Sequence, residues 1–190
     1  YFFRVDGVAF DINMSIDSKK HTNLDLINGI RFAQGVIFQS EFSRRLSESI
    51  LHIKPINSAT ILNGTNLELF SPRGGNIRNK LRIEDDSIVF ITSAKWRAHK
   101  RLKSIVKVFQ KLKGILSKKA YLIIVGEPDF NIESDNQIIS LGKVSYFELP
   151  SALRAGDIFL YFSWLDNCPN SVVEAIACGL PVICTNQGGT

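Results

Sequence analysis

Residues 157–184, DIFLYFSWLDNCPNSVVEAIACGLPVIC, decide the fold class of this chain. Asp157–Phe162 is a near-continuous apolar run that predicts a buried strand, and Pro181–Cys184 predicts a second one. Between them, Ser171–Cys178 has the length and the small apolar residues of a short helix. Apolar strands that alternate with helices in this order are typical of a parallel sheet covered on both faces.

The same alternation extends toward the N-terminus. Strands are predicted at Ile88–Ser93, Ala120–Val125 and Ile138–Leu141, and helices at Arg101–Leu116 and Ser145–Ala155. The first of these helices carries one apolar stripe at helical spacing, formed by Leu102, Ile105, Phe109, Leu112 and Leu116. The second half of the chain is therefore predicted to form a doubly wound parallel-sheet domain.

An earlier block repeats the pattern on a smaller scale. Helices are predicted at Asn23–Ala33 and from Ser40 to about Ser49, and strands at Gly35–Ser40 and Ala59–Leu62. A run of turn formers, Ser71–Asn76, follows this block and is typical of a linker. Two such blocks joined by a linker predict two doubly wound domains.

The predicted organisation has three parts. Residues 1–66 form the C-terminal part of an N-terminal domain, residues 67–86 form the interdomain linker region, and residues 87–190 form a second domain that is truncated at its C-terminus. Because the chain begins at Tyr1 without an initiator Met, we expect it to start inside a longer protein, with both domains incomplete.

The composition fits a globular protein. The 190 residues are 45% hydrophobic and 22% charged, and no apolar run approaches the roughly 20 residues of a membrane-spanning helix. The start of the chain does not resemble a signal peptide. The cysteines, Cys168, Cys178 and Cys184, are odd in number and lack metal-ligand spacing, so we expect a cytoplasmic protein with no metal site.

Positive charge gathers in one segment. The formal net charge is +5, but ten Lys and Arg residues lie between Lys95 and Lys119, where there is no Asp or Glu. Lys95, Arg97, Lys100 and Arg101 stand near a predicted helix N-terminus, where the helix dipole disfavours cations. A bound anion such as a diphosphate would reverse that preference, since backbone N–H groups and cations would act on it together. The alternative is that these long side chains extend into solvent.

A pair of carboxylates follows the strand at 157–162. Asp166 and Glu174 lie eight residues apart across a strand-to-helix turn, on the side of the sheet where parallel α/β proteins bind ligands. Two carboxylates there could hold the vicinal hydroxyls of a sugar and of a ribose. The alternative for Glu174 is structural, because Ser171 and Glu174 have the spacing of a capping box.

Glycine turns follow two other strands at the same predicted edge. Gly126 and Gly142 begin short turns that could hold a base through backbone groups, although such turns are common. The sequence contains no Gly-x-Gly-x-x-Gly and no Gly-Lys-Ser/Thr motif, which disfavours a dinucleotide-binding enzyme and a P-loop enzyme.

The carboxylate segment resembles the signature of the retaining family-4, or group 1, glycosyltransferases, which have the two-domain GT-B architecture. In that signature an acidic residue is followed after seven positions by a Glu and a small-residue helix that ends in Gly-x-Pro-Val. This chain matches the signature from Asp166 to Val182, and the family's basic pair matches Lys95 and Lys100. The segment 63–72 resembles the family's interdomain motif, and the chain's closing Gly-Gly is also typical.

The resemblance extends from about residue 35 to residue 190 and implies a fold and a site. The fold would be α/β of the GT-B type, with two Rossmann-like doubly wound parallel-sheet domains, both incomplete here. Glu174 would hold the ribose hydroxyls and Asp166 a hydroxyl of the donor sugar, where the family more often has Glu. The donor diphosphate and base would be met by Lys95, Lys100, the backbone N–H groups of Asn170 and Ser171, and Val144. A family Gly that offers an N–H is replaced by Pro169.

The implied reaction moves a sugar from a nucleotide-diphosphate sugar to an acceptor hydroxyl with retention of configuration, without a cofactor or metal. Lys95, Lys100, Asp166 and Glu174 are the predicted catalytic residues, and the acceptor would be a carbohydrate or a lipid-linked glycan, not a nucleic acid. The lysines of the basic helix either contact a membrane peripherally or form a solvated face. The alternatives are a non-catalytic nucleotide- or anion-binding module and a sugar-nucleotide epimerase of the same architecture. We expect residues 1–190 alone to lack transferase activity, since transfer must position both reactants.

Overall fold

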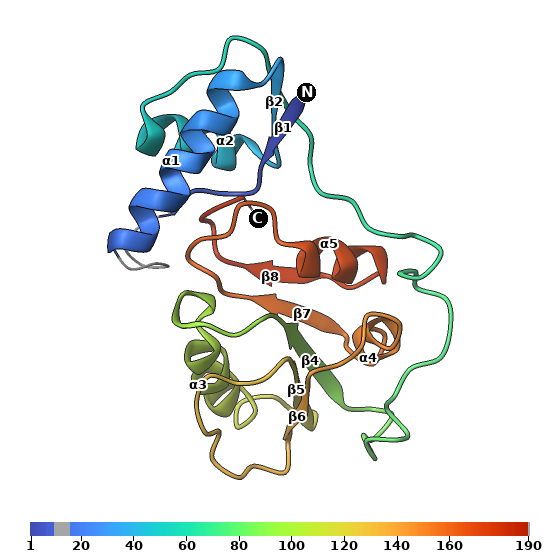
Figure 1. The fold of residues 1–190 in the computed structure, drawn as a ribbon. Helices are drawn as coiled ribbons and strands as arrows, with labels where there is room; N and C mark the ends of the chain where they lie inside the picture. Colours follow the sequence, from blue (N-terminus) through green and yellow to red (C-terminus); the bar gives the residue numbers. More distant parts are fainter. Residues whose placement is uncertain (10–15, 190) are drawn as a thin grey trace. The chain divides into compact units, whose positions relative to one another are not determined.

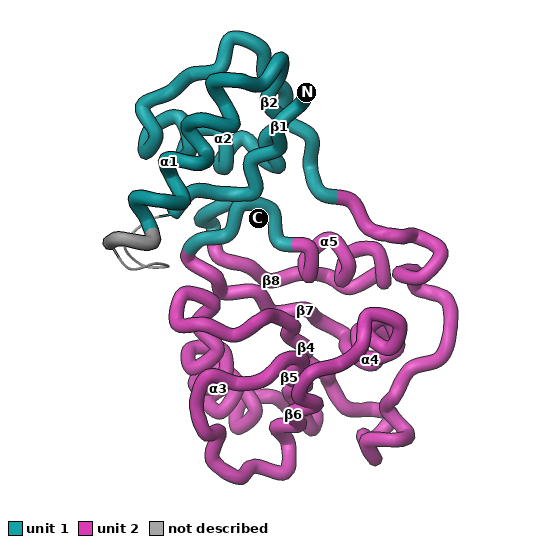
Figure 2. The backbone as a smooth tube through the Cα atoms, in the orientation of Figure 1, with its two compact units in different colours: residues 1–63, 165–169, 186–190 teal, residues 64–164, 170–185 magenta. Residues whose placement is uncertain are grey.

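The structure is a computed structural model that describes residues 1–9 and 16–189 (Figure 1). The chain divides into two compact units (Figure 2). Unit 1 comprises Tyr1–Asn63, Leu165–Pro169 and Asn186–Thr190, and unit 2 comprises Gly64–Trp164 and Asn170–Thr185. Residues 165–169, which lie between strand β7 (Ile158–Tyr161) and helix α5 (Asn170–Ala177), belong to unit 1 although both of these elements belong to unit 2.

Unit 1 is built on a parallel three-stranded sheet in the order β1-β2-β3. The strands are β1 (Phe2–Val5), β2 (Gly35–Phe38) and β3 (Ser58–Thr60), and the helices are α1 (Ile16–Phe32) and α2 (Glu41–Leu51). Strands β2 and β3 and helix α2 agree with the sequence predictions to within a few residues. Helix α1 was also predicted, but it begins earlier than expected. Strand β1 was not predicted, because four residues that include an Arg give no recognisable period.

Helix α2 begins where the sequence predicted a polar cap. The Ser40 side chain accepts a hydrogen bond from the Ser43 backbone N–H at 3.0 Å, which satisfies one of the unpaired donors of the first turn. The helix ends at Leu51, and the C-cap residue His52 has a left-handed φ of 52°. Apolar residues from the strands and both helices form the core of unit 1, among them Val5, Val8, Ile30, Val36, Phe38 and Leu51.

Unit 2 is built on a parallel five-stranded sheet in the order β6-β5-β4-β7-β8. The strands are β4 (Ile88–Ser93), β5 (Ala120–Val125), β6 (Ile138–Gly142), β7 (Ile158–Tyr161) and β8 (Val182–Cys184). All five were predicted, two of them with the same bounds. Strand β4 is the first strand of unit 2 along the chain, and it lies between β5 and β7. The strand order therefore switches direction between β4 and β7.

Both faces of this sheet are buried, as the near-continuous apolar strands predicted. Alternate residues of one strand pack into two different clusters: Val89 and Ile91 of β4 lie in one, and Phe90 lies in the other. Helix α3 (Leu102–Leu112) covers the second cluster with Leu102, Ile105 and Phe109 of the predicted stripe. The short helices are η1 (Ala98–Lys100), α4 (Leu149–Leu153) and α5 (Asn170–Ala177).

The prediction for helix α3 is corrected at both ends. Helix α3 starts at Leu102 and not at Arg101, because Arg101 has a left-handed φ of 59°. It ends at Leu112, and the next residues form a turn that contains Gly114. Leu116, the last residue of the predicted stripe, lies beyond the helix but still packs partly buried against the same cluster.

The segment predicted as the interdomain linker, residues 67–86, lies in unit 2. Phe70 and Ile83 are buried in the same cluster as Ile91 of β4. The Arg154 side chain donates hydrogen bonds to the backbone oxygens of Gly75, at 2.9 Å, and of Ser71, at 3.3 Å. These contacts tie the turn-rich segment to unit 2.

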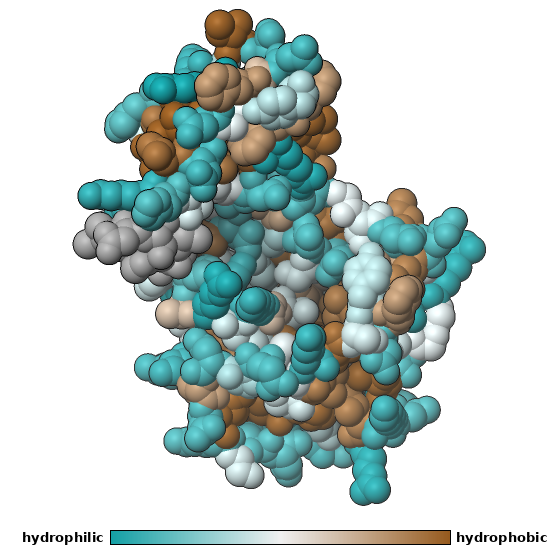
Figure 3. Space-filling model, in the orientation of Figure 1, coloured by the Kyte–Doolittle hydropathy of each residue, from teal (hydrophilic) through white to brown (hydrophobic). Residues whose placement is uncertain are grey.

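Figure 3 shows hydrophilic and hydrophobic side chains intermixed over the visible surface of each unit. Large apolar side chains of unit 1 that are exposed include Phe2, Phe32 and Ile56. Exposed apolar groups are normal on folded proteins, so hydropathy alone does not identify a site on this face.

Candidate functional site

The carboxyl ends of the unit 2 strands form the edge at which open parallel sheets bind ligands. The two central strands, β4 and β7, end at Ser93 and Tyr161, on the two sides of the point where the strand order switches. The connections that leave these ends, residues 94–101 and 162–169, contain three of the seven predicted site residues, and α5, which follows the second connection, contains three more.

The connection after β4 is anchored by Trp96. Its ring is only 7% exposed, and its Nε1 donates a hydrogen bond to the backbone oxygen of Val125 at the end of β5, at 3.0 Å. Farther along, the backbone oxygen of His99 accepts a hydrogen bond from the N–H of Trp164 at 3.0 Å. The connection is therefore fixed on both sides, with the Lys95 side chain exposed just before the first anchor.

Lys100 lies directly at the switch point. Its Nζ donates a hydrogen bond to the hydroxyl of Tyr161 at 2.7 Å, and Tyr161 is the last residue of β7. The Arg101 guanidinium instead lies over the ring of Trp164, 5.0 Å from the ring centroid. Arg101 is the N-cap residue of α3 and Lys100 directly precedes it, so both lie at the helix N-terminus as predicted, each with an aromatic side chain as a partner.

The two glycine turns meet at the same edge, as predicted. The Gly126 N–H donates to the backbone oxygen of Gly142 at 2.7 Å, and the Lys143 N–H donates to Oε1 of Glu127 at 3.2 Å. Gly126 has a φ of +99°, and a Cβ there would lie 2.1 Å from the Ala94 backbone oxygen. Only glycine fits where these turns and the connection after β4 come together.

Helix α5 carries three of the predicted site residues. Asn170 and Ser171 are its first two residues, and Glu174 lies one turn later, half-buried. Burial raises the pKa of the Glu174 carboxyl, and no charged group among the described residues contributes to that shift. The capping-box alternative is wrong, because Ser171 lies inside the helix and not at its N-cap.

The remaining predicted residues lie elsewhere. Val144, after the Gly142 turn, packs partly buried against a core cluster of unit 2. Asp166 belongs to unit 1, where its backbone oxygen accepts a hydrogen bond from the Gly189 N–H at 2.7 Å. The proposed cooperation of Asp166 with Glu174 stays a prediction, as do the ligand contacts of every residue of the site.

Sequence reasoning missed Trp96 and Tyr161. Both were visible as aromatic residues with a polar group, one within the basic segment and one at the end of an apolar strand. Tyr and Trp in such places usually need a hydrogen-bond partner. The partner itself depends on which strands are neighbours, and that could not be read from the sequence.

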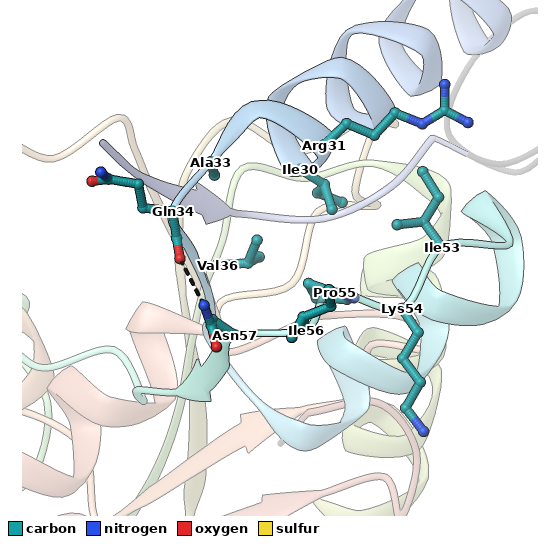
Figure 4. A pocket seen from close by; sticks show the side chains of 10 residues that line it. All are labelled: Ile30, Arg31, Ala33, Gln34, Val36, Ile53, Lys54, Pro55, Ile56 and Asn57. Carbon is teal, nitrogen blue, oxygen red and sulfur yellow. Dashed lines mark hydrogen bonds between the residues drawn. The ribbon is translucent and has the colours of Figure 1, made fainter.

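A cavity of about 370 Å³ lies within unit 1 (Figure 4). It opens beside the amino ends of β2 and β3, where the side chain of Asn57 donates a hydrogen bond to the Gln34 backbone oxygen at 3.3 Å. Its lining is mainly apolar, with Arg31 and Lys54 as its charged residues. Ligands of parallel sheets bind at the opposite, carboxyl ends, so this cavity is the weaker candidate.

Within residues 1–9 and 16–189, no three His, Cys, Asp or Glu side chains gather as metal ligands would. None of the helices in these ranges combines the length and apolar character needed to cross a bilayer.

The family follows from the sequence of the same region. The family model described as "Glycosyl transferases group 1" matches residues 75–190, more than half of the chain and nearly all of unit 2. The chain belongs to the group 1 glycosyltransferases. The resemblance found in the carboxylate segment is thereby confirmed.

Two curated relatives are similar to this group 1 chain along most of its length. It is 26% identical over 180 residues to N-acetyl-alpha-D-glucosaminyl L-malate synthase of Bacillus anthracis, covering 86% of the chain and 45% of that protein. It is 26% identical over 153 residues to UDP-Gal:alpha-D-GlcNAc-diphosphoundecaprenol alpha-1,3-galactosyltransferase of Escherichia coli, covering 73% and 39%. The chain spans less than half the length of these relatives.

Solved structures confirm the predicted α/β fold of the GT-B type. Anabaena Alr3699/HepE, in complex with UDP-glucose, matches with a TM-score of 0.76 at 19% identity, over 99% of this chain and 54% of that chain. WaaG, a glycosyltransferase involved in lipopolysaccharide biosynthesis, matches with a TM-score of 0.73 at 13% identity, over 99% and 57%.

Proposed function

We propose that this group 1 chain forms the donor side of a retaining glycosyltransferase, which moves a hexosyl group from a nucleotide-diphosphate sugar to an acceptor hydroxyl. The observation that carries the proposal is Glu174, a half-buried carboxylate on the helix that follows β7, whose pKa is raised by burial with no charged partner among the described residues. A buried carboxylate is costly without a partner. The hydroxyls of a bound ribose would supply hydrogen-bond donors to it.

The diphosphate of the donor would lie between the ends of β4 and β7. Lys100 is held at this point by Tyr161, and the exposed Lys95 lies on the same connection. Helix α5 begins with Asn170 and Ser171, whose backbone N–H groups are at the positive end of the helix dipole. Cations and N–H groups together would stabilise the charge that develops on the leaving diphosphate, with no metal required.

The other parts of the donor have candidate partners as well. The joined turns at Gly126 and Gly142 expose backbone groups at the edge, and Val144 follows them, so the base would lie there. The Asp166 carboxylate would accept a hydrogen bond from a hydroxyl of the sugar. UDP is the first nucleotide to test, because HepE is named as a complex with UDP-glucose and the Escherichia coli relative is named for UDP-Gal.

The acceptor is proposed to be a carbohydrate or a lipid-linked glycan, and the protein a cytoplasmic one that meets the membrane peripherally. The name of the Escherichia coli relative includes a diphosphoundecaprenol acceptor, which supports this proposal. Lys103, Lys107 and Lys111 are exposed on α3, where they could contact anionic lipid.

The test is turnover of UDP-glucose and UDP-galactose, each labelled at C1, by the full-length protein with mixed glycan acceptors. A labelled product whose anomeric NMR signal has the configuration of the donor is the expected result. Inverted product would refute retention alone. Conversion of the labelled sugar nucleotide into its epimer would show an epimerase and not a transferase. Binding of nucleotide without any turnover would show a non-catalytic binding module.

A further inference from the structure

Two buried tyrosines in the sheet of unit 2 each contact a lysine, one at the carboxyl ends of the strands and the other at their amino ends. Tyr161 ends β7 and contacts Lys100, whereas Tyr121 lies near the start of β5 and contacts Lys119. Only the first pair lies at the carboxyl edge with the candidate donor site. Tyr161 thus places a phenolic hydroxyl at the end of a strand that is otherwise apolar.

The contact between Tyr161 and Lys100 is a hydrogen bond and not an interaction with the ring face. Lys100 Nζ lies 2.7 Å from the phenolic oxygen but 5.3 Å from the ring centroid. These distances differ by nearly the length from the ring centre to its own oxygen, so the ammonium lies beyond the hydroxyl end of the ring. A hydrogen bond from a charged donor at this length is among the stronger ones in proteins.

The ring that carries the hydroxyl is rigidly held. Tyr161 is only 3% exposed, and its ring stacks on that of Phe159 with centroids 6.4 Å apart and planes at 14°. Lysine by contrast has a flexible four-carbon stem and loses much rotamer freedom when it is held in one position. A fixed acceptor at the end of β7 therefore selects where the Lys100 ammonium rests.

We propose that Tyr161 is a positioning residue, which holds the Lys100 ammonium at the strand switch point before an anionic ligand arrives. The inference rests on the proposed function, because it takes the diphosphate of a sugar nucleotide as that anion. Holding the cation in place beforehand lowers the ordering cost of binding. Tyr161 would act only through Lys100.

The test is isothermal titration of the full-length protein with UDP, and with uridine as a ligand that lacks phosphate. Tyr161→Phe removes one oxygen and keeps the ring stack, so a melting curve should confirm that it folds. We expect UDP affinity to fall about three- to tenfold, the scale of one ordinary hydrogen bond, because Tyr161 acts on the ligand only through Lys100, with uridine affinity unchanged. Tyr121→Phe, the matched change at the amino edge, should leave UDP affinity as it is.

The decisive comparison places Tyr161→Phe in a Lys100→Ala background. If Tyr161 acts through Lys100, its substitution there has no further effect on UDP affinity. An equal loss with and without Lys100, or no loss in either background, would overturn the inference while leaving the donor site intact. If the wild-type protein binds none of UDP, GDP, ADP and CDP, the proposed function itself fails and the inference with it.

Discussion

Replacing Glu174 with Gln removes one negative charge from a half-buried position in α5 and leaves the shape of the side chain nearly unchanged. Because burial raises the pKa of this carboxyl, the ionised form is less favourable in the folded protein than in the unfolded chain. A raised folded pKa contributes stability below the unfolded pKa, and this contribution is lost as the pH rises through the folded value. At pH 7 the ionised Glu174 therefore costs stability, and Glu174→Gln should not lower the melting temperature.

Nucleotide binding should respond in the opposite direction. Hydrogen bonds to an ionised acceptor are about twice as strong as those between neutral groups, so ribose hydroxyls should bind Gln more weakly than Glu. We expect a loss of about 1.4 kcal/mol, which is about tenfold in affinity for UDP. The combination of equal or higher stability with weaker binding is what a ligand-binding carboxylate predicts.

Titration calorimetry with UDP and melting curves between pH 4.5 and 7 measure both effects. Any gain in melting temperature at pH 7 should shrink toward pH 4.5, where protonation neutralises the wild-type carboxyl. Glu84→Gln is the matched control, because Glu84 is exposed and forms an ion pair with Lys119. These two residues precede β4 and β5, so they lie at the amino ends of the strands, away from the carboxyl edge. Unchanged UDP affinity in Glu174→Gln, or a melting temperature several degrees lower, would refute the role given to Glu174.

Three further changes test the parts around Glu174. Lys100→Ala should lower kcat more than it raises KM for the donor in steady-state kinetics, because charge on the leaving diphosphate grows in the transition state; a raised KM with unchanged kcat would contradict this. Gly126→Ala should destabilise the fold by about 2 kcal/mol or more in urea melts, through its positive φ and the clash with the Ala94 oxygen, whereas Gly75→Ala has open space and should not. Trp96→Phe should cost about 1 kcal/mol in the same melts for the lost hydrogen bond, and equal stability would show that Trp96 does not anchor its connection.

Elements buried on both faces were the ones that the sequence predicted best. Strands β4 and β5 agree with their predicted bounds, because almost all of their residues are buried and most of them pack into one of the two apolar cores. Strand β1 escaped prediction because only one of its four residues, Val5, is fully buried. The start of α3 also escaped, since the left-handed Arg101 has no signature in the sequence.

The site was predictable as a set of residues but not as an arrangement. Lys100 and Glu174 were singled out from charge and from the family signature, and both lie on segments that leave the carboxyl edge of the sheet. The hydrogen bond from Lys100 to Tyr161 joins residues 61 positions apart. It exists because β7 pairs with β4, and strand order cannot be read from local periodicity. The same holds for Trp96 and its acceptor at the end of β5.

Hydrogen exchange of the full-length protein, measured by mass spectrometry with and without UDP, tests the central claim most directly. A donor site at the carboxyl edge predicts that UDP slows exchange in residues 94–101, in the turns at 126–127 and 142–144, and in the first turn of α5. Exchange in the loop at 52–57, which lines the cavity of unit 1, should stay unchanged. Protection confined to that loop, or no protection anywhere at saturating UDP, GDP, ADP or CDP, would contradict the account.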